Sequence, residues 1–304
     1  MEGMDYNSHK SGYVALVGKP NVGKSTFLNH YLGQKIAATS PKPQTTQRRQ
    51  LGILTLPGAQ IIFVDTPGLH TGDFRLSQFI NQEARLALGD ADLLLFMVDA
   101  SQPPESEDQK LAEEIIEKAG STPKLLVMNK IDQASPERLQ INQEAYQTLL
   151  DFDAFVMISV ITAQGRDDLL TQIIAMLPEG PAYFPEEQIT ATNEREIAGD
   201  LIRAAAMQQL RDELPYVLFV RVNEYTMRDE GIRYIHATIF VERDSHKGIV
   251  IGKGGRMIKK ISTLARQEIE AMSGEAVFLD LQVKVEKNWR NNPEFLRRHG
   301  LSND

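Results

Sequence analysis

Apolar runs alternate with amphipathic stretches through the first 180 residues of the chain. The runs lie at residues 13–17, 60–65, 92–99, 124–129 and 154–159. Between them, apolar residues recur at helical spacing, for example over 106–120 and 165–177. Uninterrupted apolar strands that alternate with amphipathic helices are typical of a parallel sheet with helices on both faces. The pattern therefore predicts an α/β domain.

One segment departs from this alternation. Residues 50–65 read "QLGILTLPGAQIIFVD", with two apolar runs on either side of Pro57 and Gly58. A proline followed by glycine between such runs is typical of a tight turn, so the segment predicts a hairpin. The two strands of a hairpin are antiparallel. We therefore expect a mostly parallel six-stranded sheet with one antiparallel strand.

The order of elements changes after residue 180. Three prolines and one glycine between residues 177 and 187 indicate a linker, which we place at 181–192. A helix, two strands, an apolar stretch, a glycine loop, a helix and a strand are expected at 193–213, 216–225, 233–243, 247–252, 252–255, 256–272 and 276–286. The sequence thus predicts an α/β domain over 1–180 and an α+β domain over 193–304.

Composition narrows the class of protein. The 304 residues are 42% hydrophobic and 24% charged, which is ordinary for a folded soluble chain long enough for two domains. No window approaches about 18 uninterrupted apolar residues, and the polar N-terminus lacks the apolar core of a signal peptide. The absence of cysteine excludes disulfides, thiol catalysis and cysteine–zinc sites. Together these features favour a cytoplasmic protein.

The net charge of −8 hides an uneven distribution. Residues 1–180 hold 15 Lys and Arg against 22 Asp and Glu, whereas 181–304 hold 18 against 19. Residues 243–260 hold six Lys and Arg but a single acid, Asp244. Because local potential rather than total charge attracts a polyanion, this basic cluster is a candidate nucleic-acid site.

A glycine-rich loop follows the first apolar run. Residues 18–25 read "GKPNVGKS" and fit the pattern G-x-x-x-x-G-K-S/T between a strand and a helix. The glycines allow a turn whose N–H groups converge on phosphates. Lys24 can reach the outer phosphates, and Ser25 can offer its hydroxyl to Mg²⁺. The flanking strand and helix disfavour the alternative, a chance match in a surface loop.

A second motif, "DTPG" at 65–68, closes another apolar run. Ligands of open α/β sheets bind at the carboxyl ends of strands. Asp65 is therefore expected in the outer shell of the metal, with the Gly68 N–H facing the terminal phosphate. Alone, the motif would more often mark an ordinary turn after a strand.

A third motif, "NKID" at 129–132, closes the next run but one. Asp132 can accept hydrogen bonds from the N1–H and the exocyclic amine of guanine, an edge that adenine lacks. Asn129 would support the base and its loop, and Lys130 would lie along the plane of the base. The order and spacing of the three motifs predict a GTP site.

The three motifs resemble the translation-factor-like class of P-loop GTPases. That resemblance implies a first switch over 35–50 whose threonine hydroxyl binds Mg²⁺; the candidates are Thr45 and Thr46, and Thr46 is preferred. It also implies a base-contacting element at Ser159 and Val160, although Ser159 could instead cap the end of a strand. The expected nucleotide and metal site consists of Asn21, Val22, Gly23, Lys24, Ser25, Thr26, Thr46, Asp65, Gly68, Asn129, Lys130, Asp132, Ser159 and Val160.

Leu69 stands where many GTPases carry a water-orienting glutamine. A leucine cannot orient or deprotonate water, so we expect slow intrinsic hydrolysis that depends on stabilisation of charge. The residues expected to act in catalysis are Lys24, Asn21, Thr46 and Gly68. In a related subgroup an asparagine at the position of Asn21 helps to bind K⁺. The alternative is that Asn21 only shapes the loop.

The late glycine loop, "VIGKGG" at 250–255, does not fit a second nucleotide site. It lacks both the G-x-G-x-x-G spacing of dinucleotide folds and the lysine and serine of a phosphate loop. Gly252 and Gly255 instead have the GxxG spacing of KH domains, whose loop clamps a nucleic-acid backbone. The order of helix, two strands, short helix, loop, helix and strand resembles a type II KH domain. The alternative is a helix–helix turn with a solvated lysine face.

The KH interpretation predicts a set of RNA-binding residues. They are Gly252, Lys253, Gly254, Gly255, Arg256, Lys259 and Lys260, with Ile249 and Val250 as an apolar floor. Trp289 could stack on a base, but we expect it to be a packing anchor, because a lone tryptophan after a strand usually buries its area.

Nearly the whole chain, through "PNVGKSTFLN", "DTPGLH", "VIGKGG" and "VKVEKNW", resembles the Era family of bacterial GTPases. The resemblance implies a monomer that binds GTP and GDP with Mg²⁺ and acts as a nucleotide-dependent switch. It further implies binding near the 3′ end of small-subunit ribosomal RNA, a role in 30S maturation and peripheral contact with the inner membrane. Two departures from the family pattern, Val160 and Ala163, lie in the base loop and leave its contact with the base an open question. A third is Gln47, where an arginine is frequent. The alternative is a membrane-peripheral regulatory GTPase whose KH domain contacts protein.

Overall fold

The structure, a computed structural model, describes residues 9–39, 42, 48–67, 74–228 and 231–302. The chain folds into two compact units. The first comprises 1–33, 48–69 and 82–191, and the second comprises 34–47, 70–81 and 192–304. Among the described residues, no helix has the length and hydropathy needed to cross a membrane.

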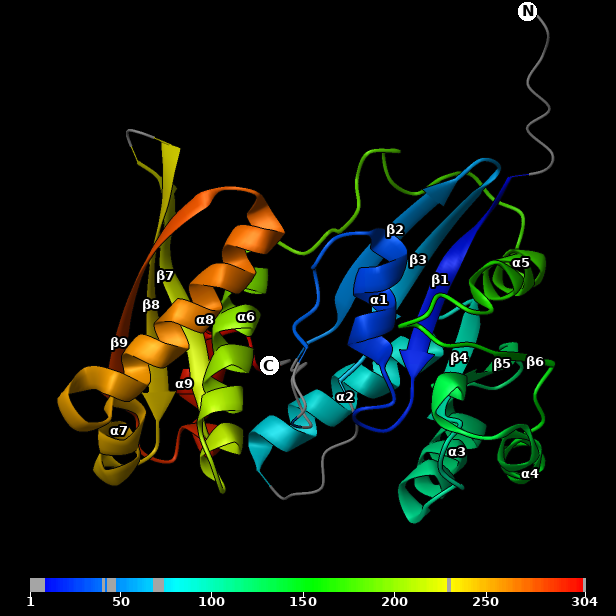
Figure 1. The fold of residues 1–304 in the computed structure, drawn as a ribbon, viewed down its shortest axis with the longest axis horizontal. Coiled ribbons are helices and arrows are strands. Elements are labelled where there is room, and N and C mark those ends of the chain that lie inside the picture. The colour runs from blue at the N-terminus through cyan, green and yellow to red at the C-terminus, as the bar shows by residue number, and fades with distance from the viewer. Residues whose placement is uncertain (1–8, 40–41, 43–47, 68–73, 229–230, 303–304) are drawn as a thin grey trace, which may run out of the picture. The chain divides into compact units, whose positions relative to one another are not determined.

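The first unit is built on a six-stranded sheet with the strand order β2-β3-β1-β4-β5-β6 (Figure 1). The strands are β1 (Lys10–Val17), β2 (Gln50–Leu56), β3 (Ala59–Asp65), β4 (Leu93–Asp99), β5 (Lys124–Asn129) and β6 (Ala154–Met157). The β2–β3 pair is antiparallel and the other pairs are parallel, which confirms the predicted hairpin. The helices that follow along the chain are α1 (Lys24–Leu32), α2 (Arg75–Gly89), α3 (Ser106–Lys118), α4 (Pro136–Gln147) and α5 (Arg166–Met176). Residues 75–81 of α2 belong to the second unit.

Both faces of this sheet are covered, which explains the uninterrupted apolar runs. Every residue of β3 is buried. On one face, Phe27 of α1 meets Phe63 of β3 edge to face, with ring centroids 5.3 Å apart. On the other face, Phe96 of β4 belongs to a buried cluster with Leu111 and Ile115 of α3. Strands buried on both sides cannot alternate apolar with polar residues, so they read as continuous apolar segments.

Helix α4 lies in a stretch that the sequence analysis left unassigned. The helix is largely polar, and its only buried side chains are Asn142 and Tyr146. Its apolar spacing is therefore too sparse to predict a helix. Local contacts stabilise the N-terminus of α4. The Ser135 hydroxyl accepts the N–H of Arg138, and Pro136 occupies the first turn.

The segment expected as a linker is bound along the first sheet for most of its length. The Gln60 side-chain oxygen accepts the N–H groups of Tyr183 and Phe184 at 2.7 and 2.9 Å. The Thr190 hydroxyl donates to the Leu51 carbonyl at 2.6 Å. The boundary between the two units falls between residues 191 and 192, so most of the proposed linker belongs to the first unit. The domain limits of 1–180 and 193–304 stay predictions.

The second unit is built on a three-stranded sheet with the order β7-β8-β9. The strands are β7 (Phe219–Met227), β8 (Ile232–Val241) and β9 (Ala276–Val285), and the helices are α6 (Glu194–Gln209), α7 (Asp244–Ile251), α8 (Arg256–Ser273) and α9 (Pro293–Arg298). The β7–β8 pair is antiparallel and the β8–β9 pair is parallel. Figure 1 shows α6 and α8 on one face of this sheet. The predicted α+β class is confirmed.

Helix α6 ends at Gln209, four residues before the predicted end at 213. Leu210 is extended, with φ −88° and ψ 162°, and Asp212 has φ +56°. Neither conformation continues a helix, and Pro215 lacks the N–H that a longer helix would need. The apolar spacing runs past the end of the helix because Leu210 and Leu214 are buried outside it.

Trp289 is a packing anchor, as expected. Its side chain is fully buried, and its indole N–H donates to the Val217 carbonyl at 3.1 Å. The rings of Phe219 and Phe295 lie 5.7 Å from the Trp289 ring. A buried indole whose N–H is satisfied inside the unit has no face left for a base.

Candidate functional site

The phosphate loop leads from β1 into α1. A Cβ atom added at Gly18 would lie 2.2 Å from the Met97 carbonyl oxygen, so β4 leaves no room for a larger residue at that position. Asn21 is exposed and has φ +64°, a conformation that asparagine tolerates better than most residues. Helix α1 begins at Lys24, so its free N-terminal N–H groups adjoin the loop. This arrangement is suited to binding an anion.

Lys24 is buried and points back into the loop. Its ammonium donates to the carbonyl oxygens of Gly18 at 2.5 Å and of Lys19 at 3.0 Å. Burial lowers the pKa of Lys24 below its ordinary value, and the nearby Asp65 carboxylate opposes that shift. The two carbonyl oxygens hold the Lys24 ammonium in the loop, and phosphate oxygens could take their place.

Ser25 and Asp65 lie together as the sequence predicted for a metal site. The Ser25 hydroxyl donates to an Asp65 carboxylate oxygen at 3.0 Å. Asp65 is fully buried at the end of β3. A hydroxyl beside a carboxylate provides the hard oxygen ligands that Mg²⁺ prefers. Thr46, Gly68 and Leu69 fall outside the described residues.

Asn129 joins the phosphate loop to the base loop. Its amide nitrogen donates to the Val22 carbonyl at 2.8 Å, and its oxygen accepts the Val160 N–H at 3.1 Å. Ser159 is buried, and its hydroxyl accepts the Thr162 N–H at 3.2 Å, which is the capping role considered as its alternative. The structure thus brings together the predicted motifs at 18–25, 129–132 and 159–160.

Lys130 and Asp132 differ in their surroundings. Asp132 is exposed, so its carboxylate is open to a base. The Lys130 ammonium donates to Asp99 at the end of β4, at 2.7 Å. Burial alone would raise the pKa of Asp99, but hydrogen bonds from Lys130 and Ser101 lower it below its ordinary value. The sequence analysis missed Asp99, although its place at the end of an apolar run was the signal that identified Asp65.

Lys19, inside the phosphate loop, was also missed. Its ammonium lies 2.9 Å from Glu105 and 3.0 Å from Asp108, at the start of α3. Asp108 is fully buried and accepts the Glu105 N–H at 2.8 Å, closing a capping box. Because Lys19 and Asp108 are 89 residues apart, no local pattern could have paired them.

The second glycine loop lies between α7 and α8 and contains three glycines with positive φ. Gly252 has φ +74°, and a Cβ there would lie 2.7 Å from the Cβ of Met257. Gly254 and Gly255 also have positive φ, but a Cβ at either would meet open space. Helix α8 begins at Arg256, so its N-terminal N–H groups adjoin this loop as well.

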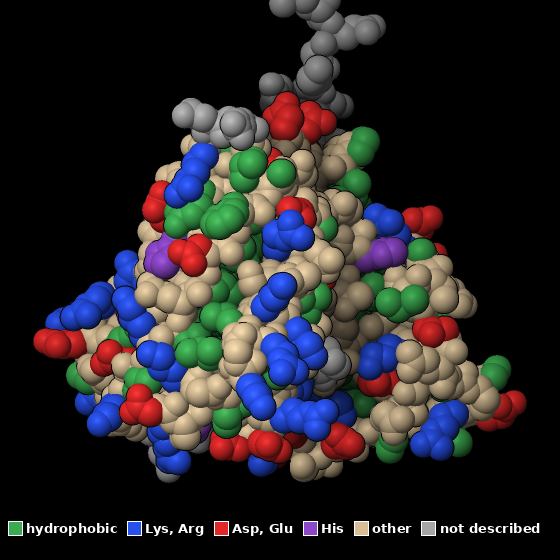
Figure 2. Space-filling view, turned by 60° about the vertical axis from the view of Figure 1, so that its left-hand side comes forward, with side chains coloured by type: hydrophobic (Ala, Val, Ile, Leu, Met, Phe, Trp, Pro, Cys, Tyr) green, Lys and Arg blue, Asp and Glu red, His purple; other side chains and the backbone are tan. Residues whose placement is uncertain are grey.

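The predicted RNA-binding residues are mostly exposed. Lys253, Gly254, Arg256, Lys259 and Lys260 are exposed, and Ile249 is 51% exposed. Figure 2 shows Lys and Arg side chains gathered on the face that carries α8. The prediction for Val250 needs correction. This side chain is fully buried, because it lies on the side of α7 that packs into the core, so it supports the helix and does not offer surface.

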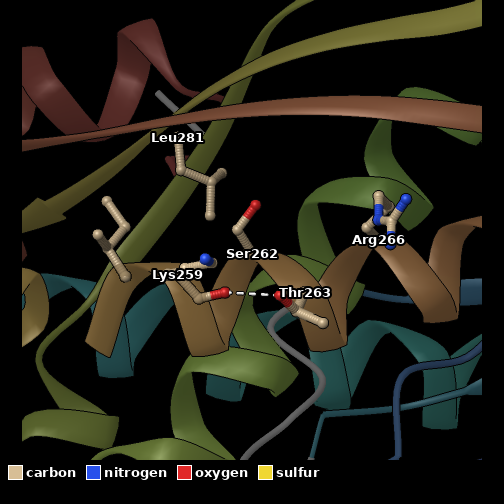
Figure 3. Close-up of a pocket in the computed structure, with 6 residues that line it drawn as sticks. Lys259, Ser262, Thr263, Arg266 and Leu281 are labelled. Atoms are coloured by element: carbon tan, nitrogen blue, oxygen red, sulfur yellow. Dashed lines mark hydrogen bonds between the residues drawn. The ribbon is translucent and has the colours of Figure 1, made fainter. Parts of the chain in front are cut away.

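A groove between α8 and β9 adds residues that the sequence analysis missed. The missed residues are Ser262, Thr263, Arg266 and Leu281, and Ile258 and Lys259 complete the lining. Figure 3 shows Leu281 pointing from β9 toward α8, with Ser262 directed toward it. The recurrence of 258, 262 and 266 at four-residue steps was a usable signal, since such residues share one helix face.

A second groove lies on the other side of α8, beside the end of α6. Gln209, Arg256, Lys259, Lys260, Thr263, Leu264 and Gln267 line it. Lys259 and Thr263 therefore belong to both grooves, and the Thr263 hydroxyl donates to the Lys259 carbonyl at 2.9 Å. Three cations beside this groove make it attractive to phosphate.

Comparisons with known proteins agree with both halves of this description. A family described as 50S ribosome-binding GTPase matches residues 13–130, and a KH domain family matches residues 213–290. The structure of a variant of Aquifex aeolicus Era bound to GDP·AlF4⁻ is similar, with 38% identity, a TM-score of 0.90, and coverage of 96% of this chain and 99% of that one. A structure of Era with MgGDPNP and nucleotides 1506–1542 of 16S ribosomal RNA has 38% identity, a TM-score of 0.89, and coverage of 97% and 99%. The chain, a P-loop GTPase domain followed by a KH domain, belongs to the Era family of GTPases.

Proposed function

We propose that this protein hydrolyses GTP and binds small-subunit ribosomal RNA near its 3′ end through its KH domain. One observation carries the proposal. An Era structure that holds both MgGDPNP and 16S ribosomal RNA nucleotides is similar to 97% of this chain at 38% identity. A likeness that spans both domains supports both activities in one protein, whereas a likeness to one domain would support only one of them.

The residues around Ser25 and Asp65 fit a magnesium ion bound with the nucleotide. Ser25 would ligate the ion directly, Asp65 would act through its outer shell, and Thr46 is the proposed ligand from the first switch. The ion would neutralise charge that develops on the phosphates. Lys24 would exchange its two carbonyl contacts for phosphate oxygens. With Leu69 in place of glutamine, the expected intrinsic rate is slow.

Guanine selection rests on the base loop. Asp132 would accept hydrogen bonds from guanine N1–H and its amine, and Asn129 would hold the loop through Val22 and Val160. Lys130 would lie along the base while its ammonium stays near Asp99. Asp132→Asn should therefore move preference from GTP toward xanthosine triphosphate. Xanthine has a carbonyl where guanine has its exocyclic amine, and the asparagine amide can donate a hydrogen bond to that carbonyl.

RNA would pass over the GxxG loop and into the groove of α8 and β9. The loop glycines allow close approach to the backbone, and Lys253, Arg256, Lys259 and Lys260 supply positive charge. Ile258 and Leu281 would form an apolar floor beneath the bases. Phosphate contacts of this kind make affinity fall steeply with salt.

Further roles follow only from the family. They are assistance in 30S maturation as a nucleotide-dependent switch, peripheral contact with the inner face of the cell membrane, a cytoplasmic location and a monomeric state. The similarity to an RNA-bound Era favours ribosomal RNA over protein as the partner of the KH domain.

The test compares Gly254→Asp with Gly254→Asn. Both residues tolerate positive φ and would stand in open space, so neither should disturb the fold. The aspartate brings a carboxylate to the expected phosphate position. We expect it to weaken binding of RNA with the 3′-terminal small-subunit sequence about tenfold or more beyond the asparagine variant, with GTP hydrolysis unchanged in both. Equal RNA affinities would contradict the assignment of the loop.

A further inference from the structure

The three-stranded sheet has an outer face that α6 and α8 do not cover. Along β8, Ile235, Ala237 and Ile239 are buried toward the helices. Alternate residues point to the opposite face of a strand, so Tyr234 and His236 lie on the outer face. Parallel pairing sets Tyr234 beside Phe278 of β9 in the same register. Hydrophobic side chains gather at this end of the sheet in Figure 2.

Three side chains form a row across this face. The Arg228 guanidinium lies 3.4 Å above the Tyr234 ring. The Tyr234 and Phe278 rings are stacked, with centroids 5.9 Å apart and planes at 17°. The row starts at the end of β7, crosses β8 and ends on β9, which is an edge strand. Its order is therefore cation, phenol, phenyl, with the phenyl ring at the edge.

The end of this row at Phe278 is open. Phe278 is 58% exposed, the most exposed phenylalanine among the residues that the structure describes. Cross-strand packing with Tyr234 accounts for one face of the Phe278 ring and leaves the other uncovered. An exposed aromatic ring already stacked on another ring provides a flat surface of the kind on which nucleic-acid bases stack.

The row is continuous with the KH groove through β9. Leu281 lines the groove from the helix-facing side of the strand, and Phe278 lies on the outer side. Residues of α8 touch β9 on both sides of Phe278. The Ser262 hydroxyl donates to the Leu279 carbonyl at 3.5 Å, and the Val277 N–H donates to Glu270 at 3.1 Å. A strand of RNA that leaves the groove along α8 therefore meets the edge of β9 at Phe278.

The charges beside the row suit a polyanion. Arg228 is at its inner end, and two described acids beside it are paired, Asp280 with His236 at 2.9 Å and Glu275 with Arg233 at 2.8 Å. A third, Glu224, lies opposite His236 on β7 and accepts the Thr226 hydroxyl at 3.0 Å. The side chain of Gln282, bound to His236 at 2.7 Å, continues the polar surface along β9. Stacking faces with arginine behind them are the usual elements of single-strand binding without sequence preference.

We propose that Phe278, backed by Tyr234 and Arg228, is a stacking platform for a base of single-stranded RNA. That base would lie beyond those held in the GxxG groove. The inference rests on the proposed RNA-binding function and extends its footprint around the edge of β9. A KH loop clamps about four nucleotides, so the platform would engage only longer RNA.

The test uses single-stranded RNA oligonucleotides of about four and ten nucleotides, drawn from the 3′-terminal small-subunit sequence. Phe278→Ala should weaken binding of the longer RNA about 5- to 100-fold, the effect of losing one stacked base, and leave the shorter RNA unchanged. Phe278→Trp should retain or strengthen binding of the longer RNA. Met227→Ala removes a half-exposed hydrophobic side chain whose strand partner is Arg233, and is the matched control, expected to have no effect.

The outcomes separate this inference from the function on which it rests. If wild type binds both oligonucleotides and Phe278→Ala binds both equally well, the platform is wrong and the face belongs to a protein partner or to none. If wild type binds neither, the proposed RNA function itself fails and takes the platform with it. Unchanged binding of the shorter RNA by Phe278→Ala establishes that its KH domain is folded.

Discussion

Lys19 of the phosphate loop lies 3.0 Å from the fully buried Asp108 of α3. Burial alone would lower the pKa of Lys19, but hydrogen bonds to Glu105 and Asp108 raise it above the ordinary value, so the ammonium stays charged. Asp108 also caps α3 through the Glu105 N–H. The loop that surrounds the phosphates is therefore attached to a helix start by a charged pair from which water is largely excluded.

We predict that Lys19→Met weakens GTP binding about tenfold, because the loop loses the contact that fixes its second residue. It also leaves Asp108 buried without its cation, which should lower the free energy of unfolding by about 3 kcal/mol. Titration with a fluorescent GTP analogue and urea denaturation measure the two effects. Lys19→Arg, which keeps the charge and can reach both carboxylates, is the control and should restore most of both.

Lys19→Met can change GTP affinity and stability to different extents. The comparison shows whether Lys19 positions the phosphate loop or only stabilises the fold. Glu105→Gln removes the charge of the other partner of Lys19. The Glu105 side chain is 63% exposed, so this change should leave GTP affinity and stability nearly unchanged. If Lys19→Met lost stability but bound GTP as tightly as wild type, the pair would hold α3 and have no role in positioning the loop.

The pair at Lys130 and Asp99 predicts a pH dependence. The folded-state pKa of Asp99 is below its ordinary value of 3.8. In the folded protein the Asp99 carboxyl therefore stays ionised at pH values where the same group in the unfolded chain begins to bind a proton. The stabilisation is fully present above about pH 5 and is lost as pH falls through the folded-state pKa. Asp99→Asn should therefore be less stable than wild type at pH 7, and the difference should shrink near pH 3. Urea denaturation at the two pH values measures it, and an equal difference at both would contradict the role of the charge.

The sequence predicted most of the fold because the apolar runs of a sheet covered on both sides are unmistakable, and because β2 and β3 meet at a Pro-Gly turn. It also located Ser25, Asp65 and Asn129, since each stands at a fixed place in a motif at the end of a strand. It missed Asp99 and Asp108, whose partners lie 31 and 89 residues away. Pairing over such distances is decided by how β4 and α3 pack, which no local spacing encodes.

Val250 is a residue for which the local sequence pattern suggested the wrong role. Its apolar character beside the GxxG loop suggested a surface for RNA, but its side chain is fully buried, whereas its neighbour Ile249 is half exposed. The apolar run 249–251 is uniform in sequence, so it does not reveal which side of so short a helix faces the core. That side is fixed by the docking of α7 in the second unit, a tertiary contact.

The contact between Ser25 and Asp65 predicts how metal and nucleotide binding are linked. Ser25→Ala removes the hydroxyl that is expected to ligate Mg²⁺, whereas Ser25→Thr keeps it. We expect the alanine variant to lose the gain in GTP affinity that Mg²⁺ gives wild type, and the threonine variant to keep it. GTP titrations with Mg²⁺ and with a chelator measure the gain. If the alanine variant gained as much from Mg²⁺ as wild type, the metal would be held elsewhere.

Asn21 carries the prediction about a monovalent cation. If its side chain helps to hold K⁺ against the phosphates, GTP hydrolysis should be about tenfold faster in K⁺ than in Na⁺ at equal ionic strength, a gain of about 1.4 kcal/mol in the barrier. Asn21→Gly keeps the backbone free to adopt φ +64° but removes the amide, so it should hydrolyse GTP at the slower rate in both salts. Steady-state release of phosphate measures the four rates. Equal rates for wild type in K⁺ and Na⁺ would reduce Asn21 to a residue that shapes the loop.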